Sequence, residues 1–113
     1  MIPPLTDHSF DKVIESAPTP TLVGFWSPAC RNCKSLLYEL DRLLEEKNRG
    51  IAVYKMNVAE NHQIPAEYEI SSLPALALFS NGRFVQFIGG IGKKEAIRAA
   101  VEKALGDRSR KAS

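Results

Sequence analysis

The chain has 113 residues, of which 44% are hydrophobic and 25% are charged, and its formal net charge is +2. This length and composition indicate one globular domain, large enough to bury a core without disulfide bonds to hold it together. The small net charge argues against a nucleic-acid-binding protein, and no stretch approaches the ~18 apolar residues of a membrane span. We therefore expect neither nucleic acid nor a membrane among its partners.

The two ends of the chain indicate a compartment and a domain boundary. Residues 1–10 have neither the basic n-region nor the apolar h-region of a secretory signal, so we expect a cytoplasmic protein. Thiols are kept reduced there, and permanent structural disulfides are rare. We expect residues 1–106 to form a single domain and the basic segment 107–113 to form a flexible tail.

The first predicted helix could be capped by Thr6 or Asp7, and its apolar face begins at Phe10 and continues at the i+3 and i+4 positions. Two prolines within 17–21 end this helix, because proline cannot continue it. Before the helix, residues 2–5 could form only a short edge strand, since two of them are prolines without a backbone N–H.

Two strands follow, separated by the longest helical pattern in the chain. Segment 21–26, TLVGFW, is almost wholly apolar, which predicts a central strand covered on both faces. Gly24 is unexpected within it, because glycine weakens a strand and has no side chain to pack. Segment 51–58 is rich in β-branched and aromatic residues and predicts the second strand.

The helical pattern between these strands runs from about residue 30 to 48, with Gly50 suited to the position just after its end. A weaker helical turn is expected at 65–69, with Pro65 as its first residue. The long helix has a stripe of leucines on one face: Leu36, Leu37, Leu40, Leu43 and Leu44.

The last third of the chain predicts a hairpin and a helix. Two strand-like runs within 74–90 flank Asn81-Gly82, the dipeptide best suited to a type I′ turn. An amphipathic helix is expected over 93–105 and should end at Gly106. The order α, β, α, β, α, β, β, α predicts an α/β domain, with parallel strands joined through helices and an antiparallel hairpin at one edge.

Both cysteines of the chain, Cys30 and Cys33, lie at the start of the long helix. Unpaired N–H groups and the positive end of the helix dipole favour a thiolate at that position, and Arg31 adds positive charge. The cysteines are one helical turn apart on one face, so they can close a disulfide. This arrangement predicts exchange: Cys30 attacks a disulfide of a partner, and Cys33 then attacks the mixed disulfide to release the partner.

Two other roles for the cysteines are less well supported. Two small apolar residues could be close by chance, but cysteine is scarce and this context is specific. Structural zinc needs four ligands, and the remaining candidates, His8 and His62, lie at spacings that no small zinc module uses. We therefore expect no metal and no bound cofactor, since the cysteines themselves carry the electrons.

A C-x-x-C motif beside a β–α pattern is typical of the thioredoxin-like fold, and the chain resembles the thioredoxin family over about residues 5–105. LVGFWSPACRNCK resembles the family's strand and active-site motif, usually written LVDFWAxWCGPCK, and LTDHSFDKVI resembles its opening segment. SSLPALALFSNG resembles the segment that carries the family's cis-proline. The resemblance implies a thioredoxin fold, a central mixed β-sheet flanked by helices on both faces.

The resemblance also implies roles for single residues. Cys30 would be the nucleophile and Cys33 the resolving thiol, with Trp26 packed beside them. Pro74 would be the cis-proline facing the pair, and it would leave the backbone of Leu73 free to bind a substrate strand.

Gly90 falls where the family keeps a glycine, and we expect it in the substrate site as well.

Several residues depart from the family pattern. Gly24 replaces an aspartate that is thought to help Cys33 lose its proton. Lys55 matches the lysine that pairs with this aspartate, so it must reach solvent, pair elsewhere or become neutral. Ala29 replaces a tryptophan of the docking surface, and Tyr38 replaces a proline that kinks the helix.

The dipeptide between the cysteines is Arg31-Asn32 where the family usually has Gly-Pro. Loss of the proline loosens the turn, and the arginine favours the reduced thiolate form. We therefore expect a weaker reductant than a standard thioredoxin.

The sequence is compatible with two functions. The leading one is a monomeric, cytoplasmic oxidoreductase that reduces disulfide-containing proteins and is recharged by a thioredoxin-reductase-type donor or another thiol system. The alternative is a thioredoxin-like binding module with little or no redox turnover, which the changes at Gly24, Ala29 and Tyr38 favour.

Overall fold

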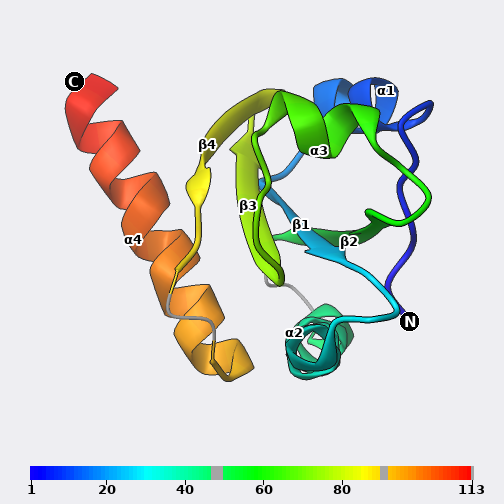
Figure 1. The fold of residues 1–113 in the computed structure, drawn as a ribbon. Coiled ribbons are helices and arrows are strands. Elements are labelled where there is room, and N and C mark those ends of the chain that lie inside the picture. Colours follow the sequence, from blue (N-terminus) through cyan, green and yellow to red (C-terminus); the bar gives the residue numbers. More distant parts are fainter. Residues whose placement is uncertain (47–49, 90–91, 113) are drawn as a thin grey trace.

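The computed structural model describes residues 1–46, 50–89 and 92–112, with side-chain burial as far as residue 106. The elements occur in the predicted order (Figure 1). They are α1 (Phe10–Ser16), β1 (Thr21–Trp26), α2 (Arg31–Glu45), β2 (Ala52–Asn57), α3 (Gln63–Glu67), β3 (Ala75–Ser80), β4 (Arg83–Phe87) and α4 (Lys94–Ala112). Among the described residues, no helix is both long enough and apolar enough to cross a bilayer.

The strands form one mixed sheet in the order β2-β1-β3-β4. Strand β1 is central as predicted and parallel to β2, and β4 forms the hairpin with β3. Strand β3 differs from the expected parallel arrangement, because it is antiparallel to β1 although a helix, α3, precedes it. Asn81 and Gly82 have φ angles of +55° and +76°, the backbone of the predicted type I′ turn. Helices α1 and α3 cover one face of the sheet, and α2 and α4 cover the other (Figure 1).

Side chains of β1 alternate between two apolar cores. Leu22 packs with residues of α2 and α4, whereas Val23 and Phe25 pack with residues of α1 and α3. Each of these three side chains is fully buried, and burial of one such side chain contributes roughly 1.5–3 kcal/mol. The two cores hold β1 between layers of helices and so fix the loop that follows Trp26.

The N-terminal segment adds a minimal edge to the sheet beside β2. Pro4 forms an isolated parallel bridge with Lys55, and the Leu5 N–H donates to the Lys55 carbonyl at 2.7 Å. This matches the short edge strand expected from the two prolines.

The helix ends differ from the sequence-based expectations. Helix α2 ends at Glu45 rather than near residue 48, so Gly50, at φ +69°, is not the residue just after it; residues 47–49 lie outside the described part. The chain turns away at Glu46, whose carboxylate is bound by Lys94 at 2.8 Å and by Arg98, both on α4.

At the C-terminus, Gly106 does not end α4, which continues to Ala112. A single glycine costs only about 1 kcal/mol relative to alanine inside a helix, and no proline follows it. The backbone of 107–112 is therefore helical, and the flexible tail over 107–113 stays a prediction.

Asp7 caps a different helix from the one expected. Ser9 is the N-cap residue of α1, while the Asp7 carboxylate accepts the N–H groups of Gln63 at 3.0 Å and Ile64 at 2.9 Å at the start of α3. Desolvation raises the pKa of Asp7, but the hydrogen bonds from these backbone groups outweigh it, so the pKa lies below its ordinary 3.8. Pro65 is accordingly the third residue of α3, not the first.

Candidate active site

The two cysteines lie where β1 leads into α2. A turn after β1 is closed by the Cys30 N–H, which donates to the Ser27 carbonyl at 3.1 Å, and Pro28 suits the second position of such a turn. Cys30 is the N-cap residue of α2, and Cys33 lies in its first turn.

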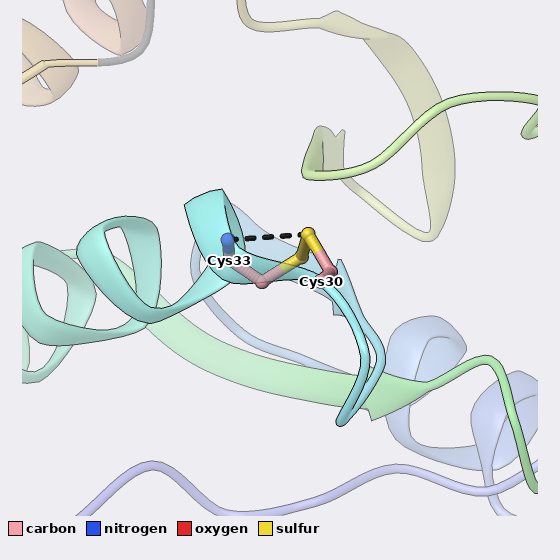
Figure 2. The surroundings of a disulfide bond; sticks show 2 residues. All are labelled: Cys30 and Cys33. Atoms are coloured by element: carbon pink, nitrogen blue, oxygen red, sulfur yellow. Dashed lines mark hydrogen bonds between the residues drawn. A yellow bond between two sulfur atoms is a disulfide. The ribbon is translucent and has the colours of Figure 1, made fainter.

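Cys30 and Cys33 are joined by a disulfide, with their Cα atoms 5.4 Å apart (Figure 2). The Cys33 N–H donates to the Cys30 sulfur at 3.2 Å, so the sulfur takes the place of an oxygen as the cap of the helix. Cys30 is partly exposed, whereas Cys33 is 1% exposed. A partner can therefore reach the Cys30 sulfur much more readily than the Cys33 sulfur.

The charge around the pair is positive. Arg31 is exposed at the first position of α2, and the first turn of this helix, which is fully described, holds no acidic residue. Free N–H groups and the helix dipole add to the same effect. Such an environment favours a thiolate over a thiol at the N-terminus of a helix.

A groove of about 550 Å³ runs beside Cys30. We call it the active-site groove; one of its walls is the loop that leads to Pro74, where the Leu73–Pro74 peptide bond is cis, as the resemblance implies. Gly90, expected in the same site, lies outside the described residues. The groove is lined by Cys30, Arg31, Asn32, Val58, Pro65, Ile70, Ser71, Ser72 and Leu73.

Comparison with known proteins decides the family. The Thioredoxin family model matches residues 1–103. A thioredoxin of Rickettsia felis is 36% identical over 101 residues, which span 89% of this chain and 96% of the relative. The chain belongs to the thioredoxin family.

Two further thioredoxins give the same result. One from Rickettsia prowazekii is 32% identical over 105 residues, 93% of this chain and 100% of the relative. Thioredoxin 1 of a Nostoc species is 32% identical over 101 residues, 89% and 94% of the two chains. The chain is accordingly a thiol–disulfide oxidoreductase with the thioredoxin fold and a C-x-x-C pair, and the alternative of a binding module gains no support from these comparisons.

Gly24, the main departure from other thioredoxins, has a packing explanation. A Cβ atom added there would lie 2.8 Å from Cδ1 of Leu40, and 3.7 and 3.9 Å from the nearest side-chain atoms of Leu36 and Leu37. Leucine side chains of α2 thus fill the space into which a side chain at position 24 would point. Close packing of helix on sheet stands here where the family pattern has an aspartate.

Lys55 pairs with Gly24 in the register of β1 and β2, so it has no carboxylate beside it at that position. Its side chain instead contacts Trp26. Its ammonium nitrogen is 5.6 Å from the centroid of the Trp26 ring, within the range of a cation–π interaction. The indole nitrogen of Trp26 is buried and has no hydrogen-bond partner among the described residues. Trp26 therefore interacts through its ring face and edge packing rather than through its N–H.

Three features of this site are not predicted by the sequence. The filling of the space at Gly24 by Leu40 and the pairing of Lys55 with Trp26 join segments that are distant in sequence. Asp7 supports the groove indirectly, because it caps α3, and Pro65 of α3 lines the groove. Among the described residues, no group of three or more histidine, cysteine, aspartate or glutamate side chains is placed to hold a metal ion.

Proposed function

We propose that this thioredoxin reduces disulfides in partner proteins, with Cys30 as the attacking thiol and Cys33 as the resolving thiol. The observation that carries this assignment is the difference in exposure of the two sulfur-bearing residues. Cys30 is partly exposed and lines the active-site groove, whereas Cys33 is 1% exposed. An incoming disulfide would meet Cys30 first.

The reaction balances in two steps. The Cys30 thiolate attacks one sulfur of the partner's disulfide, forms a mixed disulfide and expels the other partner sulfur as a thiolate, which takes a proton. Cys33 then loses its proton and attacks the Cys30 sulfur, which forms the Cys30–Cys33 disulfide and releases the second partner thiol. Two electrons pass from the pair to the partner, so no bound cofactor is needed.

The groove gives the partner a place to bind during these steps. Its walls are mostly apolar and hydroxyl-bearing, and Leu73 lines it together with Cys30. We assign the backbone of Leu73 to pairing with an extended segment of the partner, and Pro74 and Gly90 to the same substrate site. Arg31 is assigned to stabilising the Cys30 thiolate.

We also propose a direction of electron flow, an electron donor and a compartment. We place this protein in the cytoplasm as a monomer that acts as a reductant and is recharged by a thioredoxin-reductase-type donor. Arg31 at the exposed start of α2 favours the dithiol form, so we expect a weaker reductant than a standard thioredoxin.

Trapping tests the roles of the two cysteines. The Cys33→Ser variant, reduced and mixed with a protein that contains a disulfide, should accumulate a mixed disulfide through Cys30, visible as added mass on non-reducing analysis. Cys30→Ser is the matched control and should trap little, because its remaining thiol is buried. Equal trapping by both variants would overturn the assignment of roles, and no trapping by either would favour the binding module.

A further inference from the structure

A second hollow, of about 700 Å³, adjoins the active-site groove between the start of α2 and the start of α4. Asn32 lines both cavities, and the Leu73–Pro74 pair joins them, with Leu73 on the groove and Pro74 on the hollow. The hollow is also lined by Lys34, Tyr38 and Lys93. A polypeptide seated beside Cys30 can therefore continue past Asn32 into this hollow.

The uncompensated charge of the hollow is positive. Lys34 and Lys93 are exposed, and their side chains form no ion pair or hydrogen bond within the described part of the chain. Glu39, the one acidic residue among the lining residues described, is already engaged: Oε1 accepts the Lys94 N–H at 2.9 Å and the Arg42 guanidinium at 3.2 Å. The Glu39 side chain is 14% exposed, so it does little to offset the two lysines.

Tyr38 supplies an aromatic surface beside these lysines. It is 63% exposed, although it is a large side chain on a helix that is otherwise well packed. The Arg42 guanidinium lies 5.8 Å from the ring centroid, within the range of a cation–π interaction. Exposed aromatic side chains act as anchors at protein-binding surfaces. The two lysines beside Tyr38 add a positive charge that selects for an acidic partner.

We propose that the second hollow binds an acidic segment of the protein substrate, one that carries a carboxylate beside an apolar residue. Tyr38 follows Cys30 by eight residues, which is about 12 Å along a helix at ~1.5 Å per residue. An extended chain covers that distance in about four residues at ~3.3 Å each. The preferred substrate thus has an apolar residue about four positions from its reacting cysteine, where it meets Tyr38, and an acidic residue next to it. This inference rests on the proposed function, since it describes how that reaction selects its substrates.

Matched peptides test it. Each substrate is a symmetric disulfide dimer of a peptide that contains one cysteine. The acidic peptide has a Glu-Leu pair four residues before its cysteine and another four residues after it. The neutral peptide has Gln-Leu at the same two places. We measure the second-order rate constant for reduction by the reduced protein, with hydroxyethyl disulfide as a probe too small to reach the hollow. At low salt the acidic peptide should react about fivefold faster than the neutral one, and added salt should remove the difference.

Variants of the residues that line the second hollow test whether it causes the preference for the acidic peptide. The double variant Lys34→Gln/Lys93→Gln should bring the two peptide rates within twofold of each other and leave hydroxyethyl disulfide unaffected. Tyr38→Ala should lower both peptide rates about threefold. The control Lys12→Gln, an exposed lysine of α1 on the other face of the sheet, should keep the fivefold preference.

Each other outcome counts against the proposal. Equal rates on the two peptides in the parent, or an unchanged preference in the double variant, would overturn the subsite while leaving the proposed function intact. A parallel fall of all three rates in the double variant would show that the lysines act on Cys30 itself and would also overturn it. If even hydroxyethyl disulfide is not reduced, the proposed function fails, and the subsite fails with it.

Discussion

Replacing Gly24 with aspartate restores the carboxyl group of the family pattern, and we expect it to destabilise this protein. The position is fully buried, and a Cβ there would lie 2.8 Å from Cδ1 of Leu40, itself 0% exposed. Carbon atoms in good contact are about 3.5–4.0 Å apart. Leu40 must therefore move by roughly 1 Å before the carboxyl group is even accommodated.

The loss of unfolding free energy in Gly24→Asp has two parts. Overpacking of a buried site costs about 1–3 kcal/mol, and a polar group buried without a full set of partners costs about 1–3 kcal/mol. Lys55, the register neighbour of Gly24, can offset some of the second part. We expect Gly24→Asp to lower the free energy of unfolding by about 3 kcal/mol at pH 7, within these ranges.

The loss should depend on pH in a defined direction. Burial among leucines raises the folded-state pKa of the new carboxyl group above its unfolded value. The folded state then binds a proton more tightly than the unfolded state, so the loss is complete above the folded pKa and shrinks as the pH falls toward about 4.

A double-mutant cycle with Leu40→Ala, followed by urea unfolding of the oxidised protein, isolates the steric part. Leu40→Ala alone should cost about 2–5 kcal/mol, but the double variant should lose at least about 1 kcal/mol less than the sum of the single losses. Ala77→Asp, a buried β3 position on the opposite face of the sheet, is the control and should add to Leu40→Ala without coupling. Additive losses for Gly24→Asp, or no loss at all, would refute the packing account of Gly24.

Three further predictions concern single side chains. Lys55→Met should remove the cation–π contact, lower the unfolding free energy by about 0.5–1 kcal/mol and change the emission of Trp26; unchanged emission would show that the contact is not made in solution. Asp7→Ala should lower stability by about 0.5–1 kcal/mol at neutral pH through loss of the α3 cap. Because the folded pKa of Asp7 lies below 3.8, this difference should be constant near neutrality and vanish as the pH falls through that lowered pKa; a gap that persists in acid would contradict it. Arg31→Gln should lower the reduction potential of the Cys30–Cys33 pair by about 10–20 mV, measured against glutathione. A higher potential in the variant would contradict the role of Arg31 in stabilising the Cys30 thiolate.

Local chemistry explains what could be predicted from the sequence. The order of the elements follows from the spacing of apolar residues, and Asn81-Gly82 predicts its turn because both residues tolerate positive φ. The position of Cys30 as the N-cap of α2 was also predictable, since a strand-to-helix junction with two cysteines a turn apart is a local pattern.

Contacts between distant segments explain what could not be predicted. Asp7 caps a helix 56 residues away in sequence, so its local position before α1 is misleading. Glu46, directly after α2, is bound by Lys94 of α4, and Leu40 of α2 lies over Gly24 of the sheet. Each of these depends on how helices and sheet pack together, which no pattern within a single segment encodes.

The most direct test of the account is the redox equilibrium of Cys30 and Cys33. The protein is equilibrated in graded mixtures of reduced and oxidised glutathione, its free thiols are alkylated, and the two forms are counted by mass. We predict a reversible pair with a potential between that of thioredoxin, about −270 mV, and that of protein disulfide isomerase, about −180 mV. A pair that stays open under strongly oxidising buffers would contradict its function in exchange, and a potential at or below about −270 mV would contradict the role given to Arg31.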